Sequence, residues 1–196
     1  MTDESALLVT VPAAEPAVAR HRSRLDTSAA VGVPAHITVL YPFLPPDLID
    51  ADTHATLTRL FASVPGFRFT LDRTRWFPDP VLWLGPSDPA PFSALTGLVA
   101  AGFPSCPPYG GQVAEVIPHL TIGDGAPRAE LEAAGRSPPA PPHRNESHLG
   151  HADDWPATGL RPHRCPLDDS GDVFPRLVTT LRSAAWAAGP KSQTSA

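Results

Sequence analysis

One four-residue pattern occurs twice in this 196-residue chain: a histidine, an aliphatic residue, a threonine and a second aliphatic residue, at 36–39 and again at 119–122. Each copy lies close behind a proline, in a segment rich in the β-branched residues that favour strands. In a strand, residues i and i+2 point to the same face, so each copy presents an imidazole beside a hydroxyl while its aliphatic residues face a core. The two histidines are 83 residues apart and helical patterns follow each copy, which predicts two similar lobes with one motif strand each.

The rest of the first 135 residues alternates between strand and helix patterns. Strands are expected at 6–11, 36–41, 67–72, 81–84 and 113–122. Helices are expected at 13–25, 45–63, 88–101 and 127–135. The turn at 78–80 joins the third and fourth strands into a hairpin. This order of elements predicts an α+β fold with helices on the outer faces of the sheet.

The segment after residue 135 differs from the rest. Residues 136–172 have no strand or helix period, and four prolines lie between 138 and 142. We therefore expect a domain over 1–135, with an incomplete second lobe, followed by a proline- and histidine-rich tail over 136–196. Two hypotheses account for this tail, disorder or a change of reading frame near 136–142. A zinc site in the tail is rejected because its candidate ligands are scattered and not grouped in close pairs: His143, His148, His151, His163 and Cys165.

Composition restricts the partners. The formal net charge is −5 and the pI is about 5.8, whereas binding to long duplex nucleic acid relies on many phosphate-neutralising cations. No stretch approaches the roughly 18 apolar residues of a membrane span. We therefore expect a soluble, cytoplasmic monomer that contacts neither long duplexes nor membranes. Cys106 and Cys165 are expected to be free thiols.

The paired motifs contain the groups that phosphodiester cleavage requires. The reaction needs a base, an acid for the leaving oxygen, and hydrogen-bond donors for the non-bridging oxygens. Histidine has a pKa of about 6.5, so two imidazoles can hold opposite protonation states near neutral pH. Two threonine hydroxyls can donate to phosphate oxygens from fixed strand positions. The set needs no metal ion or other cofactor, and its expected substrate is a small nucleotide or an RNA end.

The segments GVPAHITVLYPF and PPYGGQVAEVIPHLTIG resemble the 2H phosphoesterase superfamily, and in particular its bacterial 2′,5′ RNA ligase family branch, over residues 5–135. The resemblance implies a bilobal α+β fold with pseudo-twofold related sheets. It assigns catalysis to His36 and His119 and phosphate binding to Thr38 and Thr121. It also implies action on 2′,3′-cyclic phosphates or 2′,5′-linked ends of nucleotides or RNA, with ligation as the reverse reaction.

Four further residues are candidates for contact with a substrate. Tyr41 follows the first motif, but strand parity places it opposite His36 unless the strand bends. Tyr109 lies in a loop before the second motif, where it can stack on a base. Arg75 lies in a turn from which it can reach a phosphate, and Trp83 faces either the core or the substrate.

Two other functions fit the sequence. A single histidine-threonine pair is weak evidence, because both residue types occur in half-exposed strands for packing. In the first alternative, the chain is a purely structural protein in which the pattern arose twice by accident. Alternatively, it is a non-catalytic protein that binds nucleotides or RNA ends and has a degenerate second lobe. Turnover by the purified chain separates both alternatives from an enzyme.

Overall fold

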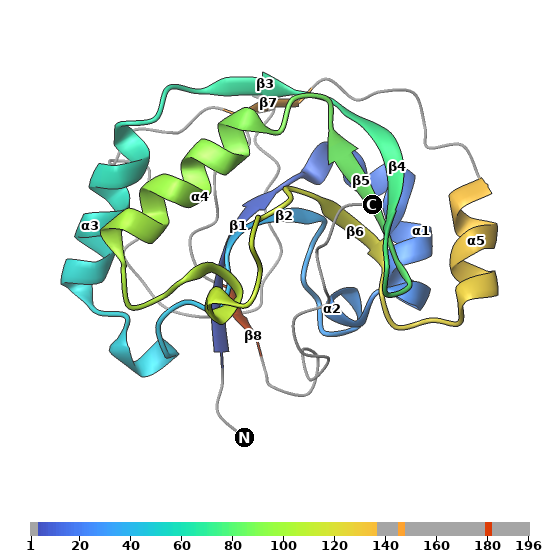
Figure 1. Cartoon of the computed structure of the whole chain (residues 1–196), viewed down its shortest axis with the longest axis horizontal. Coiled ribbons are helices and arrows are strands. Elements are labelled where there is room, and N and C mark those ends of the chain that lie inside the picture. Colours follow the sequence, from blue (N-terminus) through green and yellow to red (C-terminus); the bar gives the residue numbers. More distant parts are fainter. Residues whose placement is uncertain (1–3, 137–144, 148–178, 182–196) are drawn as a thin grey trace.

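The computed structural model describes residues 4–136, 145–147 and 179–181 (Figure 1). Its strands are β1 (Glu4–Thr10), β2 (His36–Leu40), β3 (Phe67–Phe69), β4 (Leu71–Phe77), β5 (Val81–Pro86), β6 (Leu120–Gly123), β7 (Asn145–Ser147) and β8 (Thr179–Leu181). Its α-helices are α1 (Glu15–Leu25), α2 (Thr27–Ala30), α3 (Ala51–Ala62), α4 (Ala90–Gly102) and α5 (Arg128–Arg136). Three short 3-10 helices are η1 (Pro12–Ala14), η2 (Pro46–Leu48) and η3 (Pro108–Gly111).

The strands form antiparallel sheets in the orders β2-β1-β8 and β4-β5-β6, and β3 pairs with β7. Helices and antiparallel sheets thus share one chain, and the predicted α+β class is confirmed. The two motif strands, β2 and β6, each form an edge of a three-stranded sheet. They lie side by side near the centre of the molecule (Figure 1).

The chain is built from two halves with the same order of elements. The first half runs β1, α1, β2, α3, and the second runs β5, α4, β6, α5. Within each half, the two strands pair as antiparallel neighbours. The first helix of each half packs on the motif strand of the other half. Helix α1 of the first half contacts β6 of the second, and α4 of the second half contacts β2 of the first. This exchange of helices brings the two motif strands together.

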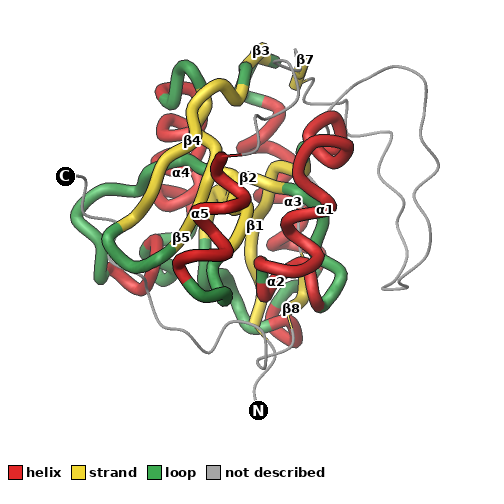
Figure 2. Tube along the Cα trace, turned by 90° about the vertical axis from the view of Figure 1, so that its right-hand side faces the viewer, coloured by secondary structure: helices red, strands yellow, loops and turns green. Residues whose placement is uncertain are grey.

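The helices cover the sheets from two sides. In Figure 1, α3 and α4 lie on one side of the motif strands, and α1 and α5 lie on the other. Figure 2 shows α1 and α5 next to each other, and the exposed ion pair between Arg24 and Glu130, at 3.6 Å, joins them. The main core between these layers contains the aliphatic residues of both motifs, Ile37, Val39, Leu120 and Ile122.

Most element boundaries lie within a few residues of the predicted ones. The hairpin is β4 with β5, so its first strand begins four residues later than expected and is preceded by the separate strand β3. The helix predicted from residue 45 is divided into η2 and α3, because the Asp50 side chain accepts a hydrogen bond from Thr53 N and begins a new helix. The predicted strand over 113–122 is reduced to β6, and His119 immediately precedes it.

The segment after residue 136 contributes two short strands to the described structure. β7 pairs with β3, although residues 136–172 have no strand period, and β8 pairs with β1 further along the tail. The domain boundary at residue 135 stays a prediction, and the candidate zinc ligands of the tail lie outside the described residues. Among the described helices, none is both long and apolar enough to cross a membrane.

Candidate active site

Both motif histidines are anchored in the same way. The Nδ1 atom of His36 lies 2.8 Å from the carbonyl oxygen of Pro34, and Nδ1 of His119 lies 2.6 Å from that of Ile117. A carbonyl oxygen can only accept, so Nδ1 carries the hydrogen in both rings. Each Nε2 is therefore the atom that gains or loses a proton. The backbone two residues upstream thus sets the tautomer and orientation of each imidazole.

Both motif strands also bulge at the same place. The register of β1 with β2 pairs Leu8 with Thr38 and then Leu7 with Leu40, so Val39 is an extra residue. The register of β5 with β6 changes in the same way immediately after Thr121. A bulge turns the following side chains relative to the strand, and such bulges are common beside active sites. Each bulge follows the threonine, so it turns the residues after the motif pair and leaves the i, i+2 relation of histidine and threonine unchanged.

The protonation of His36 is controlled by burial. Burial lowers its pKa from the ordinary 6.5 to about 4, against the hydrogen bond to Pro34, which raises it. Smaller effects come from the charges of Arg22, which lowers the pKa, Asp26, which raises it, and His119, which lowers it. His36 is therefore neutral at neutral pH. The strands that carry or follow the two histidines, β2 and β6, are in contact.

His119 is half-buried beside two aromatic rings. The ring of Phe77 packs edge-on at 4.9 Å between centroids, and that of Trp83 lies at 5.7 Å. Burial lowers the pKa of His119, and the bond to Ile117 opposes this. The Thr38 and Thr121 side chains are half-buried on the faces that carry the histidines.

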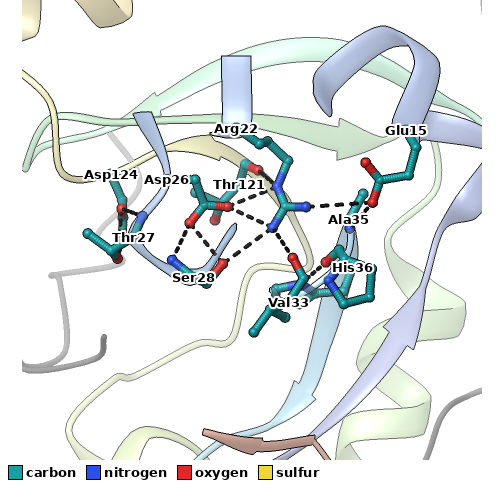
Figure 3. A network of polar contacts seen from close by, with 11 residues as sticks. Glu15, Arg22, Asp26, Thr27, Ser28, Val33, Ala35, His36, Thr121 and Asp124 are labelled. Atoms are coloured by element: carbon teal, nitrogen blue, oxygen red, sulfur yellow. Dashed lines mark hydrogen bonds and ion pairs between the residues drawn. The ribbon is translucent and has the colours of Figure 1, made fainter. Parts of the chain in front are cut away.

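A buried polar network lies behind the two motifs and was not predicted from the sequence (Figure 3). Its centre is Arg22 of α1, which is 3% exposed and pairs with the buried Asp26 at 2.7 Å. Arg22 Nε also donates to the carbonyl oxygen of Thr121 at 3.1 Å, and Nη2 donates to that of Val33 at 3.2 Å. The Asp26 carboxylate in turn accepts from Ser28 N and begins α2.

One signal in the sequence could have identified this network. Val18 and Leu25 form the apolar stripe of the first helix, and Arg22 lies between them at the i+4 position from Val18. A charged residue on a buried stripe needs partners, because an unpaired charge is costly to bury. The ionic partner, Asp26, is at the i+4 position, but the two carbonyl partners come from the turn before β2 and from β6, which only the folded chain brings together.

The structure corrects the expected orientation of Tyr41. The bulge at Val39 returns Tyr41 to the face of His36 and Thr38, where it packs with Leu8. Its hydroxyl donates to Glu4 at 2.5 Å, and burial together with Glu4 raises its pKa. It is also 8% exposed, so the expectation that it is mainly a packing residue agrees with its burial.

Tyr109 lies close to Tyr41. Its backbone N donates to the carbonyl oxygen of Tyr41 at 2.6 Å, and the two rings meet edge-on with centroids 6.5 Å apart. The backbone of Tyr109 has a φ of 51°, which is uncommon for a residue other than glycine. Such conformations are enriched where the chain must hold one particular shape. The structure therefore brings the loop before the second motif onto the end of the first.

Trp83 and Arg75 lie on the sheet face of the second motif, and the prediction that Arg75 lies in a turn was wrong, because β5 pairs with its segment and makes it part of β4. Register pairs Trp83 with Thr121 on one side and with Arg75 on the other, so the three side chains share a face. The Arg75 guanidinium lies 5.8 Å from the Trp83 ring centre. Trp83 is 4% exposed, and its Nε1 has no hydrogen-bond partner in the described part of the chain. The structure thus brings all four secondary candidates onto the two motif faces.

Two further sequence predictions concern thiols and metals. Cys106 is a buried free thiol, and Cys165 lies outside the described residues. Within the described ranges, no group of three or more histidine, cysteine, aspartate or glutamate side chains is arranged to hold a metal ion.

Comparison with known proteins identifies the family. The family model of the 2′-5′ RNA ligase superfamily matches residues 10–142. The crystal structure of E. coli LigT complexed with 3′-AMP is 22% identical with a TM-score of 0.44, covering 72% of this chain and 79% of that one. LigT complexed with ATP is 21% identical with a TM-score of 0.40, covering 72% of this chain and 78% of that one. A crystal structure of a phosphoesterase is 21% identical with a TM-score of 0.43, covering 72% of this chain and 79% of that one. A search of curated proteins gives no match.

Each half of the fold supplies one motif histidine with an anchored Nδ1, as the two motifs predict for the two-histidine class. The family match covers more than half of the chain and is direct evidence of membership. The protein belongs to the 2′-5′ RNA ligase superfamily, so the resemblance inferred from the two motifs is confirmed.

Proposed function

We propose that the chain is a metal-independent phosphodiesterase that opens 2′,3′-cyclic phosphates or cleaves 2′,5′ links in small nucleotides or at RNA ends. Ligation of RNA ends is the reverse of 2′,5′ cleavage in which the neighbouring ribose hydroxyl, and not water, attacks the phosphorus. The observation that carries the proposal is the matched anchoring of His36 and His119 through Nδ1. It leaves one exchangeable Nε2 atom in each half of the fold, His36 at the start of β2 and His119 immediately before β6, and these two strands are in contact.

The two histidines take opposite roles. His36 is the base, because burial and the nearby positive charge of Arg22 keep it neutral. Its Nε2 takes a proton from water as the water oxygen bonds to phosphorus. The bond from phosphorus to the leaving ribose oxygen breaks, and protonated His119 gives its Nε2 proton to that oxygen. A phosphate bound between the rings favours the charged form of His119, because opposite charges attract.

Further substrate contacts complete the proposal. Thr38 and Thr121 donate their hydroxyls to the non-bridging phosphate oxygens, whose charge is greatest in the transition state. Arg75 binds a phosphate outside the scissile group, next to the wall formed by Trp83. The pair Tyr41 and Tyr109 borders the base of the nucleotide on the side of the first motif.

Turnover in excess EDTA tests the function directly. The substrates are 2′,3′-cyclic mononucleotides and 2′,5′-linked dinucleotides, with product measured by chromatography. His36→Ala and His119→Ala are each expected to lower turnover by about 10²- to 10⁴-fold, whereas His21→Ala on α1 serves as the control. Full activity in either motif variant would refute the mechanism. Calorimetric binding of nucleotide without any product would instead favour the non-catalytic binding protein.

A substrate with a better leaving group separates acid from base. An activated aryl phosphodiester leaves without protonation, so it does not need the acid histidine. His119→Ala is therefore expected to recover most of its loss with this substrate, and His36→Ala is not. The reverse pattern would exchange the two roles while leaving the proposed reaction intact.

A further inference from the structure

A single buried cation links the two motif strands. β2 and β6 belong to different sheets, and Arg22 comes from a third element, α1. Its Nε donates to the carbonyl oxygen of Thr121, within β6. Its Nη2 donates to the carbonyl oxygen of Val33, three residues before His36. One planar group thus contacts the backbone beside both motifs (Figure 3).

The turn that carries His36 is held from both sides by this network. Val33 is bonded to Arg22, and the backbone N of Ala35 donates to Glu15 Oε1 at 2.6 Å. Glu15 in turn lies 3.8 Å from Arg22 Nη1. Pro34, between these two residues, supplies the carbonyl that orients the His36 ring. Movement of the guanidinium therefore displaces the group that aims the imidazole.

Asp26 fixes the plane of the guanidinium. Its Oδ2 accepts from both Nε and Nη2 of Arg22, at 2.9 and 2.7 Å, and its Oδ1 accepts from Ser28 N. A two-pronged contact of this kind sets direction as well as distance, which a lysine ammonium cannot do. Both side chains are almost completely buried, at 3% and 1% exposure.

Strand packing alone does not require a buried ion pair. On the opposite side of the molecule, α4 contacts β2 through a neutral bond from the Thr96 hydroxyl to the Val39 carbonyl oxygen. Buried ion pairs are often replaceable by apolar residues without loss of stability, because desolvation offsets their attraction. The ionic version on the α1 side therefore calls for an explanation beyond holding a helix on a sheet.

We propose that Arg22, oriented by Asp26, is a positioning residue that sets the placement of the His36 ring relative to Thr121 and His119. The inference rests on the proposed two-histidine function. The geometry that Arg22 fixes is the position of the base, His36, relative to the hydroxyl donor Thr121 and the acid His119. Arg22 touches no reacting atom in this scheme. It acts through the Val33 and Thr121 carbonyls and through Glu15.

Three variants test the proposal in the full chain. R22K keeps a positive charge and removes the planar fork. The double variant R22M/D26L replaces both members of the buried ion pair by apolar side chains, and the remaining partner, Glu15, is 35% exposed. R24Q is the matched control, because Arg24 lies two residues further along α1 in an exposed pair with Glu130. Each variant is compared with the wild type for thermal unfolding, for kcat and KM with a 2′,3′-cyclic mononucleotide, and for the ring nitrogens of both histidines by NMR.

The proposal predicts a loss of kcat that stability does not explain. In R22K and R22M/D26L, measured below their unfolding temperatures, kcat is expected to fall about 10- to 100-fold, as small misplacements of catalytic groups do. KM is expected to change less, the ring nitrogen signals of His36 are expected to shift, and R24Q is expected to match the wild type. If only R22M/D26L fails to fold, R22K carries the kinetic test.

Two results distinguish the failure of this inference from that of the proposed function. If the wild type turns over substrate and both R22K and R22M/D26L have the same kcat, the positioning role of Arg22 is overturned and the proposed function stands. A folded wild-type chain without turnover on any substrate overturns the proposed function. In that case the NMR spectra alone test whether Arg22 sets the position of the His36 ring. Ring nitrogen signals that are unchanged in both variants would overturn that role.

Discussion

Acidification probes the burial of His36 without reference to activity. The pKa of His36 is about 4 in the folded chain, whereas an unfolded histidine has a pKa near 6.5. Between these values the unfolded chain binds more protons than the folded one, so acid favours unfolding. The stabilisation is complete above about pH 6.5 and is lost as the pH falls toward about 4.

The size of this effect follows from the shift. Each pH unit inside the window costs about 1.4 kcal/mol, so the free energy of unfolding falls by about 2 to 3 kcal/mol from pH 7 to about pH 4.5 through His36. Because the ring is buried, solvent screening does not reduce this figure. His119 adds a loss of the same sign, since burial lowers its pKa too.

Urea unfolding at the two pH values measures the effect against a matched variant. His36→Asn replaces the imidazole by a neutral amide whose nitrogen can keep the bond to Pro34. Its stability is expected to fall about 2 kcal/mol less on acidification than that of the wild type. His21→Asn on α1 reports the background from a histidine outside the motifs. An equal pH dependence in His36→Asn and the wild type would show that His36 is not held neutral by burial.

Four further substitutions test the surrounding structure and the substrate contacts. Gly123→Ala places a Cβ 2.5 Å from the nearest leucine methyl and is expected to destabilise the chain by about 1 to 3 kcal/mol in thermal unfolding. Gly97→Ala, in an open position on α4, is expected to stabilise it by up to about 1 kcal/mol, so equal effects of the two would contradict the packing described. Tyr41→Phe removes the donor to Glu4 and is expected to cost about 1 to 2 kcal/mol in urea unfolding, whereas an unchanged midpoint would mean that water replaces the bond. Arg75→Gln is expected to lower kcat/KM about fivefold more for a dinucleotide than for a cyclic mononucleotide, since an exposed charge contributes at most about 1 kcal/mol. Equal losses on both substrates would exclude a second phosphate contact.

The boundaries and faces that depend on local patterns were predictable. The β-branched segment at His36 and the apolar stripe of the helix ending at Leu25 each follow from the period of their side chains. The prediction was wrong where distant contacts decide the outcome. The strand expected from residue 113 begins only at Leu120, because a strand persists only where a neighbouring strand pairs with it, and β5 pairs with this segment from Leu120 onward.

The sequence by itself determined that an imidazole and a hydroxyl share a face in each of two strands, because a strand has a period of two. The expectation that the chain does not bind long duplex nucleic acid, which rests on the net charge of −5, stays a prediction. Only the tertiary structure decided how those strands meet, since the exchange of α1 and α4 between halves is a long-range choice that no local pattern encodes. The same holds for the bulge that returns Tyr41 to the His36 face, and for the buried Arg22, whose partners lie up to 99 residues away along the chain.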